Sequence, residues 1–179
     1  MNREEIEAKI AELQAQLDEM NKEVTYGDLK AGDRFEWCGL TFVKLKNDLA
    51  LLDDLDNVKG KYCIFDPYDN NYNQSLIRQY INGKFLKLNN IDENCLLKVN
   101  DIGDIATLLS KEEYDENKDI ISRLSCCWWL RSPYAVGSYN AYVVYSGGDV
   151  HGYGVHGTDL AVRAAFNLKS DTIVSIIKR

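Results

Sequence analysis

The sequence lacks the features by which several classes of protein are recognised. Its formal net charge is −7, so it has no basic excess of the kind that nucleic-acid-binding surfaces need. No apolar run approaches the roughly 18 residues that span a bilayer. The polar first residues, MNREEIEAKIAELQAQ, do not read as a secretory signal. The strings GxxxxGK[ST] and GxGxxG, which hold nucleotides, are missing. We therefore expect synthesis in the cytoplasm, no nucleic-acid partner and no membrane insertion.

Cysteine pairs with redox or metal-binding spacing are also missing. The five cysteines are odd in number and include no CxxC pair, which indicates reduced thiols. A thiol enzyme would need Cys126 or Cys127 beside a base, for which His151 and His156 are available. Because both cysteines adjoin a tryptophan pair, buried core thiols are the favoured interpretation. Glycine-rich backbone between the histidines is poor preorganisation for a metal ion, so we expect no metal and no cofactor.

The first 24 residues carry an apolar repeat at heptad spacing. The apolar positions lie 4, 3, 4, 3 and 4 residues apart, at Ile6, Ile10, Leu13, Leu17, Met20 and Val24. Glu, Gln, Lys and Ala fill the rest, so an amphipathic helix is predicted over residues 1–24. About three heptads are marginal as an isolated helix, so the stripe needs a partner. Self-association through a short coiled coil, as a dimer or a trimer, is favoured over packing on the chain's own domain.

The rest of the chain mixes strand and helix patterns without regular alternation. RFEWCGLTFVKLKNDLALLD predicts two or three strands with turns at Cys38–Gly39 and Asn47–Asp48, and SLIRQYINGKFLKL predicts a helix. IATLL predicts a strand, after which Ser110 and Glu113 form a capping box that opens another helix. The mixture predicts an α+β domain over residues 25–179, preceded by the N-terminal helix.

Residues 134–159, YAVGSYNAYVVYSGGDVHGYGVHGTD, hold no Lys, Arg or Glu, although 27% of the chain is charged. They contain five of the eleven tyrosines, six of the twelve glycines and both histidines. AYVVYS and the residues after Gly147–Gly148 predict a hairpin with a glycine turn. A structural β region, a catalytic loop and a recognition surface are all compatible with this composition. The recognition surface is favoured, because tyrosine offers large contact area at small entropic cost and a solvent-facing β region would carry lysine and glutamate.

The strings that flank this segment resemble a known family. WWLRSP before it and VR-x-AF-x-L after it are similar to the WWLRSP…GVRPAF signature of a family of phage and Firmicute proteins. YGDLKAGDRFEWCGLTFVKL, NQSLIRQYINGKF and IATLLSKEEY fit the same family, so the resemblance covers about residues 25–168. It implies a C-type-lectin-like fold, in the branch shared with formylglycine-generating enzymes. The chain departs from the signature at Ala161 and Ala164, where Gly and Pro are usual.

Several members of that family are variable proteins of diversity-generating retroelements, in which an error-prone reverse transcriptase randomises adenines in one terminal segment. The randomised codons are typically AAY. Their mutation yields residues such as Asn, Ser, Thr, Asp, Gly, Tyr, His, Ala and Val, but not Lys, Glu, Gln, Met or Trp. Residues 134–159 contain only residues of the permitted set. The resemblance therefore implies that this segment is hypervariable.

The resemblance also assigns roles to individual residues. The scaffold residues are Trp128, Trp129, Leu130, Arg131, Val162, Arg163 and Phe166, and Tyr142 joins them because it shares strand parity with Val144. The displayed, ligand-binding residues are Tyr134, Ser138, Tyr139, Asn140, Val143, Tyr145, His151, Tyr153, His156, Thr158 and Asp159. The calcium-binding strings EPN and WND are absent, as is a convincing match to the catalytic cysteine pair of formylglycine-generating enzymes. Neither calcium-dependent sugar binding nor catalysis follows from the fold alone.

We expect a ligand-binding, receptor-binding type of protein that displays a hypervariable surface to a protein or glycan and is not an enzyme. A fixed structural or adhesin module of a virion or cell surface is the alternative. A thiol enzyme of the formylglycine-generating type is a second, less favoured alternative. The site of action, in a virion, on a host surface or in the cytoplasm, stays open.

Overall fold

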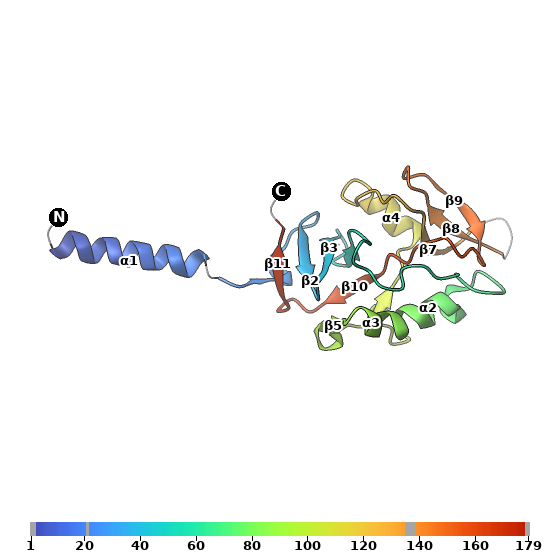
Figure 1. Cartoon of the computed structure of the whole chain (residues 1–179), viewed down its shortest axis with the longest axis horizontal. Coiled ribbons are helices and arrows are strands. Elements are labelled where there is room, and N and C mark those ends of the chain that lie inside the picture. The colour runs from blue at the N-terminus through green and yellow to red at the C-terminus, as the bar shows by residue number, and fades with distance from the viewer. Residues whose placement is uncertain (1–2, 21, 135–138, 178–179) are drawn as a thin grey trace.

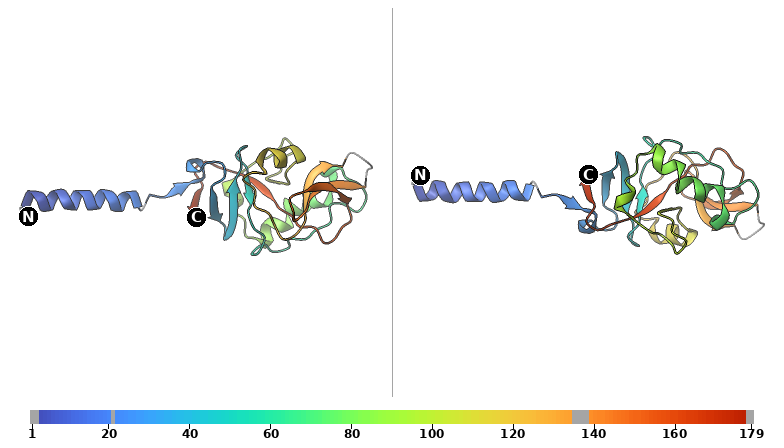
Figure 2. Two further views of the ribbon diagram at one scale, coloured as in Figure 1. Left: turned by 90° about the horizontal axis from the view of Figure 1, so that it is seen from above. Right: turned by 90° about the horizontal axis from the view of Figure 1, so that it is seen from below.

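The computed structural model describes residues 3–20, 22–134 and 139–177. Helix α1 (Arg3–Met20) projects from one end of the molecule, and a small sheet of strands β7, β8 and β9 lies at the opposite end (Figure 1). Two further views show the same separation of α1 from the domain (Figure 2). Within the described ranges, no helix combines the length and the apolar character needed to cross a bilayer.

Over residues 3–17, helix α1 does not pack against its own domain. Every side chain described in it, over residues 3–17, is exposed, so the alternative that the stripe packs on the domain is wrong for these residues. The helix is also shorter than the predicted 1–24. It ends at Met20, because Val24 belongs to strand β1 (Val24–Thr25) and pairs with Val174.

The larger sheet is antiparallel and joins both ends of the domain. Its strand order is β1-β11-β2-β3-β4-β10-β5, and β6 also pairs with β10. Cys38 and Gly39 have φ of 51° and 74°, and Asp48 has φ of 60°, the left-handed values that tight hairpin turns need. Both predicted turns are confirmed. The remaining strands are β2 (Arg34–Trp37), β3 (Leu40–Lys44), β4 (Ala50–Leu52), β5 (Leu96–Leu97), β6 (Ala106–Thr107), β10 (Ala165–Leu168) and β11 (Ile173–Ile176).

The smaller sheet carries the tyrosine- and glycine-rich segment. Its antiparallel strands are β7 (Trp128–Pro133), β8 (Asn140–Val144) and β9 (Val150–Gly154), in that order. The predicted glycine turn between β8 and β9 is confirmed. Gly148 has φ of 93°, and its amide donates to the carbonyl of Tyr145 at 2.8 Å.

The helices of the domain flank the larger sheet. Helix α4 (Lys111–Asn117) lies on one side of β10, and α2 (Leu76–Ile81) and α3 (Lys84–Leu88) lie on the other (Figure 1). The capping box that opens α4 is confirmed, since the Ser110 side chain accepts from the Glu113 amide and the Glu113 carboxylate from the Ser110 amide. Among the described residues, three 3-10 turns lie at Tyr26–Asp28, Tyr72–Gln74 and Glu93–Cys95.

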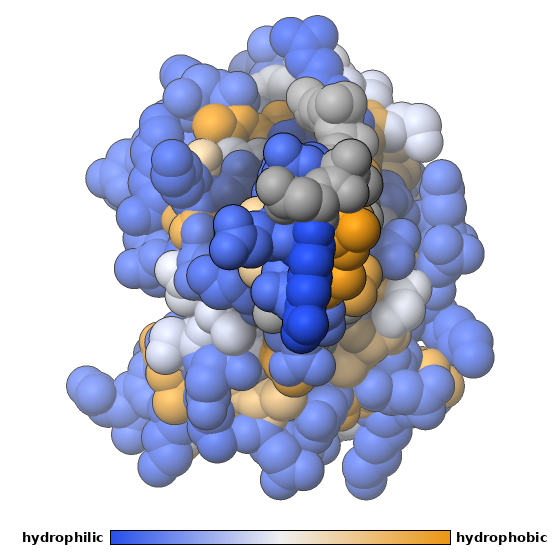
Figure 3. All heavy atoms as spheres, turned by 90° about the vertical axis from the view of Figure 1, so that its left-hand side faces the viewer, coloured by the Kyte–Doolittle hydropathy of each residue, from blue (hydrophilic) through white to orange (hydrophobic). Residues whose placement is uncertain are grey.

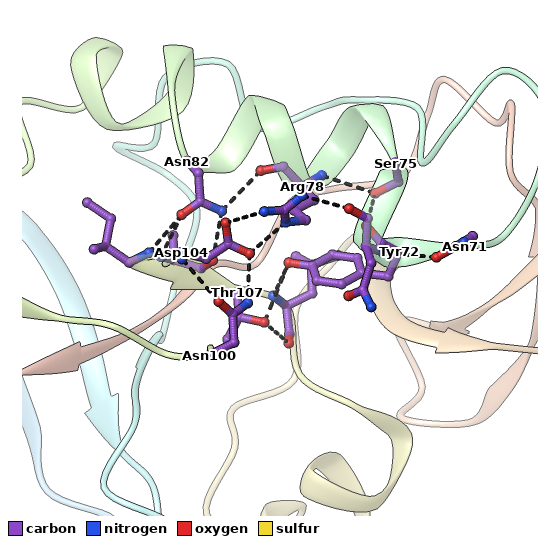
Figure 4. Close-up of polar contacts among 12 residues, drawn as sticks. Asn71, Tyr72, Ser75, Arg78, Asn82, Asn100, Asp104 and Thr107 are labelled. Carbon is purple, nitrogen blue, oxygen red and sulfur yellow. Dashed lines mark hydrogen bonds and ion pairs between the residues drawn. The ribbon is translucent and has the colours of Figure 1, made fainter. Parts of the chain in front are cut away.

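The helix predicted from SLIRQYINGKFLKL is broken into α2 and α3. The break falls at Asn82, whose side-chain oxygen accepts from the amides of Ile105 and Ala106 at 2.9 Å. A close-up of this region shows the neighbouring contacts (Figure 4). Arg78 donates to both carboxylate oxygens of Asp104 at 2.6 and 2.8 Å. Hydrogen bonds from Arg78 and Asn82 to residues 104–106 therefore decide where this helix ends. These bonds are long-range, so the local sequence pattern does not predict them.

The core joins the two sheets. Trp128 and Trp129 are 2% and 0% exposed, and Trp129 packs edge-on against Phe65 with ring centroids 5.5 Å apart. The two sheets with their flanking helices make a mixed fold of α and mostly antiparallel β structure, preceded by a helix. The expected α+β class is confirmed as far as the mixture of helices and antiparallel sheets is concerned.

Candidate ligand-binding surface

The hairpin β8–β9 places its side chains on two faces according to its register. Asn140 stands opposite Gly154, and Tyr142 stands opposite Gly152. Residues directly opposite each other in an antiparallel pair point to the same face. One face of the hairpin therefore holds an asparagine and a tyrosine on β8 and two glycines on β9.

Aromatic rings occupy the space that the two glycines leave. A Cβ at Gly152 would lie 2.5 Å from Cγ of Tyr134, and a Cβ at Gly154 would lie 3.5 Å from Cε1 of His156. The Tyr134 ring also meets Tyr142 edge-on, with centroids 5.1 Å apart. We call Tyr134, Asn140, Tyr142 and His156 the aromatic patch. It presents two phenols, an imidazole and an amide side by side on one face of the hairpin.

A loop far away in the sequence borders this patch. Asn70 donates from Nδ2 to the carbonyl of Asn140 at 2.8 Å, which ties the loop of residues 66–74 to the start of β8. Tyr68 in this loop is 77% exposed, and Tyr139, next to Asn140, is 65% exposed. Sequence reasoning did not include this loop in the site. Its string DPYDNNYNQ, polar and aromatic like residues 134–159, was the available signal.

The other predicted residues on β9 lie on the opposite face. His151 stands opposite Val143, and Tyr153 stands opposite Ala141. Tyr145 meets His151 edge-on at 6.0 Å, and Tyr153 meets the core residue Trp129 edge-on at 6.2 Å. The residues expected to form one displayed surface are therefore divided between two faces. Thr158 and Asp159 are exposed in the loop that follows, whereas Ser138 lies outside the described residues.

The structure reverses the displayed and scaffold assignments of two residues on β8, Val143 and Tyr142. Val143 is 0% exposed, so its prediction as a displayed residue is wrong; it faces the core beside Trp129, its partner in β7. Tyr142, assigned to the scaffold, is partly exposed in the aromatic patch. Tyr142 does share a face of the strand with buried Val144, but other parts of the chain pack over Val144 more completely than over Tyr142. Val144 pairs with Trp128, which packs edge-on against Tyr114 of α4, whereas the Tyr142 ring meets α4 only at Lys111, whose Nζ lies 5.9 Å from the ring centroid.

Two arginines that the resemblance assigns to the scaffold, Arg131 and Arg163, tie distant segments together. Arg163 is 0% exposed and donates to the carbonyls of Leu52, Ser122 and Asp53 at 2.6, 2.8 and 2.9 Å. Burial lowers its pKa to about 10, so it remains a cation near neutral pH. Arg131 donates to the carbonyl of Leu108 at 2.6 Å and to the Glu113 carboxylate at 2.5 Å. These bonds hold the base of the small sheet against the larger one.

Cys126, one of the two cysteines considered for a thiol enzyme, has a thiol that burial makes less acidic. Burial raises the pKa of the Cys63 thiol to about 11 and also raises the pKa of Cys126. A thiol with a raised pKa is protonated near neutral pH and is a weak nucleophile. Among the described residues, no three His, Cys, Asp or Glu side chains are grouped so that they could hold a metal ion.

Comparisons with known proteins add one finding. A family model described as "Domain of unknown function (DUF6273)" matches residues 96–170. That range, less than half of the chain, contains α4, the small sheet and β10. No curated protein and no solved structure matches the chain.

Proposed function

We propose that the chain is a ligand-binding protein that presents the aromatic patch to a protein or glycan target. The observation that carries this proposal is the pair of glycines on β9, which lets the rings of Tyr134 and His156 lie against the strand beside Tyr142. Amphipathic rings with adaptable polar neighbours are the composition of antibody-like contact surfaces. The patch belongs to the small sheet, at the end of the molecule opposite α1 (Figure 1). The patch and the helix are therefore well separated.

The scaffold proposed for this surface is C-type-lectin-like, in the branch shared with formylglycine-generating enzymes. Its support is the resemblance of residues 25–168 together with two features of the chain. Strands β1 and β11, from the two ends of the domain, pair with each other, and the segment 134–159 extends from β7 into a separate small sheet. An experimental structure of the domain, compared with known folds, tests this assignment.

Diversification by a retroelement is the proposed origin of the surface. Its support is that residues 134–159 draw only on the residues that mutated AAY codons allow. Deep sequencing of the gene and its flanking DNA from the population that carries it tests this point. We expect variation at the codons of the aromatic patch and none at Val143, with an invariant template copy nearby. A uniform sequence without a template would favour a fixed binding or structural module.

Self-association through α1 is proposed to multiply the binding surfaces. Four apolar residues of the stripe are left open to solvent: Ile6, Ile10, Leu13 and Leu17 are 42%, 56%, 53% and 50% exposed. A view along the helix onto the domain shows apolar atoms along one side of it (Figure 3). Joining several weak sites in one assembly raises the overall affinity by effective concentration.

Binding of the full chain to a glycan array and to cells of the host population tests the proposed function. We expect binding by the wild type and its loss in the triple variant Tyr134→Ala, Tyr142→Ala, His156→Ala. Tyr62→Ala is the matched control, because Tyr62 is 49% exposed and lies outside residues 134–159. Failure of the wild type to bind either target, or unchanged binding by a folded triple variant, would overturn the proposal.

A further inference from the structure

A pocket of ≈ 300 Å³ opens where the tip of the β8–β9 hairpin meets the loop after α4. Tyr114 and Trp128 line its aromatic side, and Tyr145 and Asp149 line it from the hairpin. Lys118 and Arg123 of the loop contribute two cations. The pocket does not include any member of the aromatic patch, so it is a separate feature of the small sheet.

Arg123 differs from the other arginines of the described residues. Arg3, Arg34, Arg78, Arg131 and Arg163 each form an ion pair with a carboxylate. Arg123 is exposed and forms no hydrogen bond or ion pair within the described chain, and the same holds for Lys118. In a protein with 28 acidic and 21 basic residues, two unpaired cations beside one pocket leave a local excess of positive charge.

The backbone behind these cations is held from the interior. Ser122 accepts from Arg163 through its carbonyl at 2.8 Å and from Arg34 through its hydroxyl at 2.8 Å. The Ser122 hydroxyl also donates to Asp53 at 2.7 Å. On the opposite wall, the Tyr114 hydroxyl donates to the carbonyl of Gly148 at 3.0 Å and ties the hairpin tip to α4. The pocket is thus preformed while its two cationic groups remain available.

We propose that this pocket binds a small ligand that carries one carboxylate and a hydrogen-bond donor. Arg123 can hold a carboxylate through two parallel N–H···O bonds, and Lys118 adds a second charge. Asp149 on the hairpin side accepts the donor and disfavours a ligand with more negative charge, such as phosphate. The volume suits a body of one sugar ring or one amino acid, at the lower end of ligand pockets. The donor is a hydroxyl in an acidic sugar and an ammonium in an amino acid.

Saturation-transfer NMR on the full chain tests the pocket with four probes: galacturonic acid, alanine, neutral galactose and inorganic phosphate. We expect signals from at least one of the two carboxylates, none from galactose, and weaker binding of phosphate. Arg123→Gln should weaken carboxylate binding roughly tenfold or more, because a charge-assisted bidentate contact is lost. Lys87→Gln is the control, since it removes the same charge from an exposed position on α3, on the other side of β10 (Figure 1).

Asp149→Asn distinguishes the two sources of the carboxylate. The amide oxygen still accepts a bond from a hydroxyl while the repulsion disappears, so an acidic sugar should bind a few-fold tighter. An amino acid should bind more weakly, because its ammonium loses a counter-charge. The inference would be overturned if neither carboxylate bound at about 10 mM, a concentration far above that of ordinary ligands. Phosphate binding as tight as the carboxylates, or equal losses in Arg123→Gln and Lys87→Gln, would do the same. Because no patch residue is changed, these outcomes are independent of the aromatic patch.

Discussion

The ring of Tyr134 lies against Gly152, so closely that a Cβ at position 152 would sit 2.5 Å from Cγ of the tyrosine. Gly152 is the cross-strand partner of Tyr142, which meets the same ring edge-on. The aromatic patch thus depends on a residue that offers no contact surface of its own. Any side chain at position 152 has to displace the Tyr134 ring.

Gly152→Ser should therefore disturb the patch without unfolding the domain. The Tyr134 ring is half-buried at the surface and can move outward, so we expect a change in melting temperature of no more than a few degrees. Two-dimensional NMR should show loss of the contacts between the Tyr134 and Tyr142 rings. Gly147→Ala is the control in the same hairpin, because an added Cβ there meets its nearest atom at 3.6 Å. Retention of the ring contacts in Gly152→Ser would contradict the arrangement.

Val143 and Tyr139 should respond to truncation in opposite ways. Val143→Ala removes two methyl groups from a fully buried site and should lower the free energy of unfolding by about 1.5–3 kcal/mol. Tyr139→Ala changes a side chain that is 65% exposed, so its effect should stay within about 0.5 kcal/mol. Urea unfolding followed by tryptophan fluorescence measures both. Equal destabilisation by the two variants would mean that the assignment of core and surface along β8 is wrong.

Asp104 should make stability depend on acid pH. Burial by itself would raise the pKa of Asp104, but the hydrogen bonds from Arg78 and Asn100 outweigh it and hold the pKa below its ordinary value. A carboxyl with a lowered pKa in the folded state contributes stability above its unfolded pKa of about 3.9. That contribution is lost as the pH falls through the lower, folded value.

Asp104→Asn should accordingly reduce the loss of stability on acidification. We expect the difference between wild type and Asp104→Asn in urea-unfolding free energy to be largest above about pH 5 and to shrink toward about pH 2. Asp101→Asn, at an exposed position of the same segment, is the control and should leave the pH profile as in wild type. A difference that stayed constant over this range would show that the charge of Asp104 is not what stabilises the segment.

The apolar side of α1 should decide the oligomeric state. Ile10→Lys with Leu13→Lys places two charges in the stripe, and sedimentation velocity should show a monomer where the wild type sediments as a dimer or trimer. Ala8→Lys with Ala15→Lys is the control, with the same added charge at exposed positions between the stripe residues. Truncation should stop at Lys22, because Val24 begins the pairing of β1 with β11. A monomeric wild type at tens of micromolar would remove the proposed role of α1.

Local patterns were sufficient wherever the physical cause is local. The turn at Cys38–Gly39 and the capping box of Ser110 and Glu113 depend on residues within four positions of each other, and both were predicted correctly. The break between α2 and α3 was not predicted, because Asn82 bonds to residues 23 and 24 positions away. The loop of residues 66–74 was likewise missed as a neighbour of the patch, since its bond to Asn140 spans 70 positions.

The sequence by itself determined the hairpin turns, the capping box and the unusual composition of residues 134–159, because turn and cap geometry are properties of neighbouring residues. Only the tertiary structure decided which residues of that segment face outward. Val143 and Tyr142 alternate along one strand, and alternation alone places them on opposite faces without saying which face is covered. Distant elements decide which face is covered: Trp129 lies behind Val143, whereas Tyr142 meets only the end of α4, where Lys111 Nζ is 5.9 Å from the centroid of its ring. The same packing brings Arg123 to the hairpin tip, where its guanidinium forms no ion pair with any residue that the structure describes.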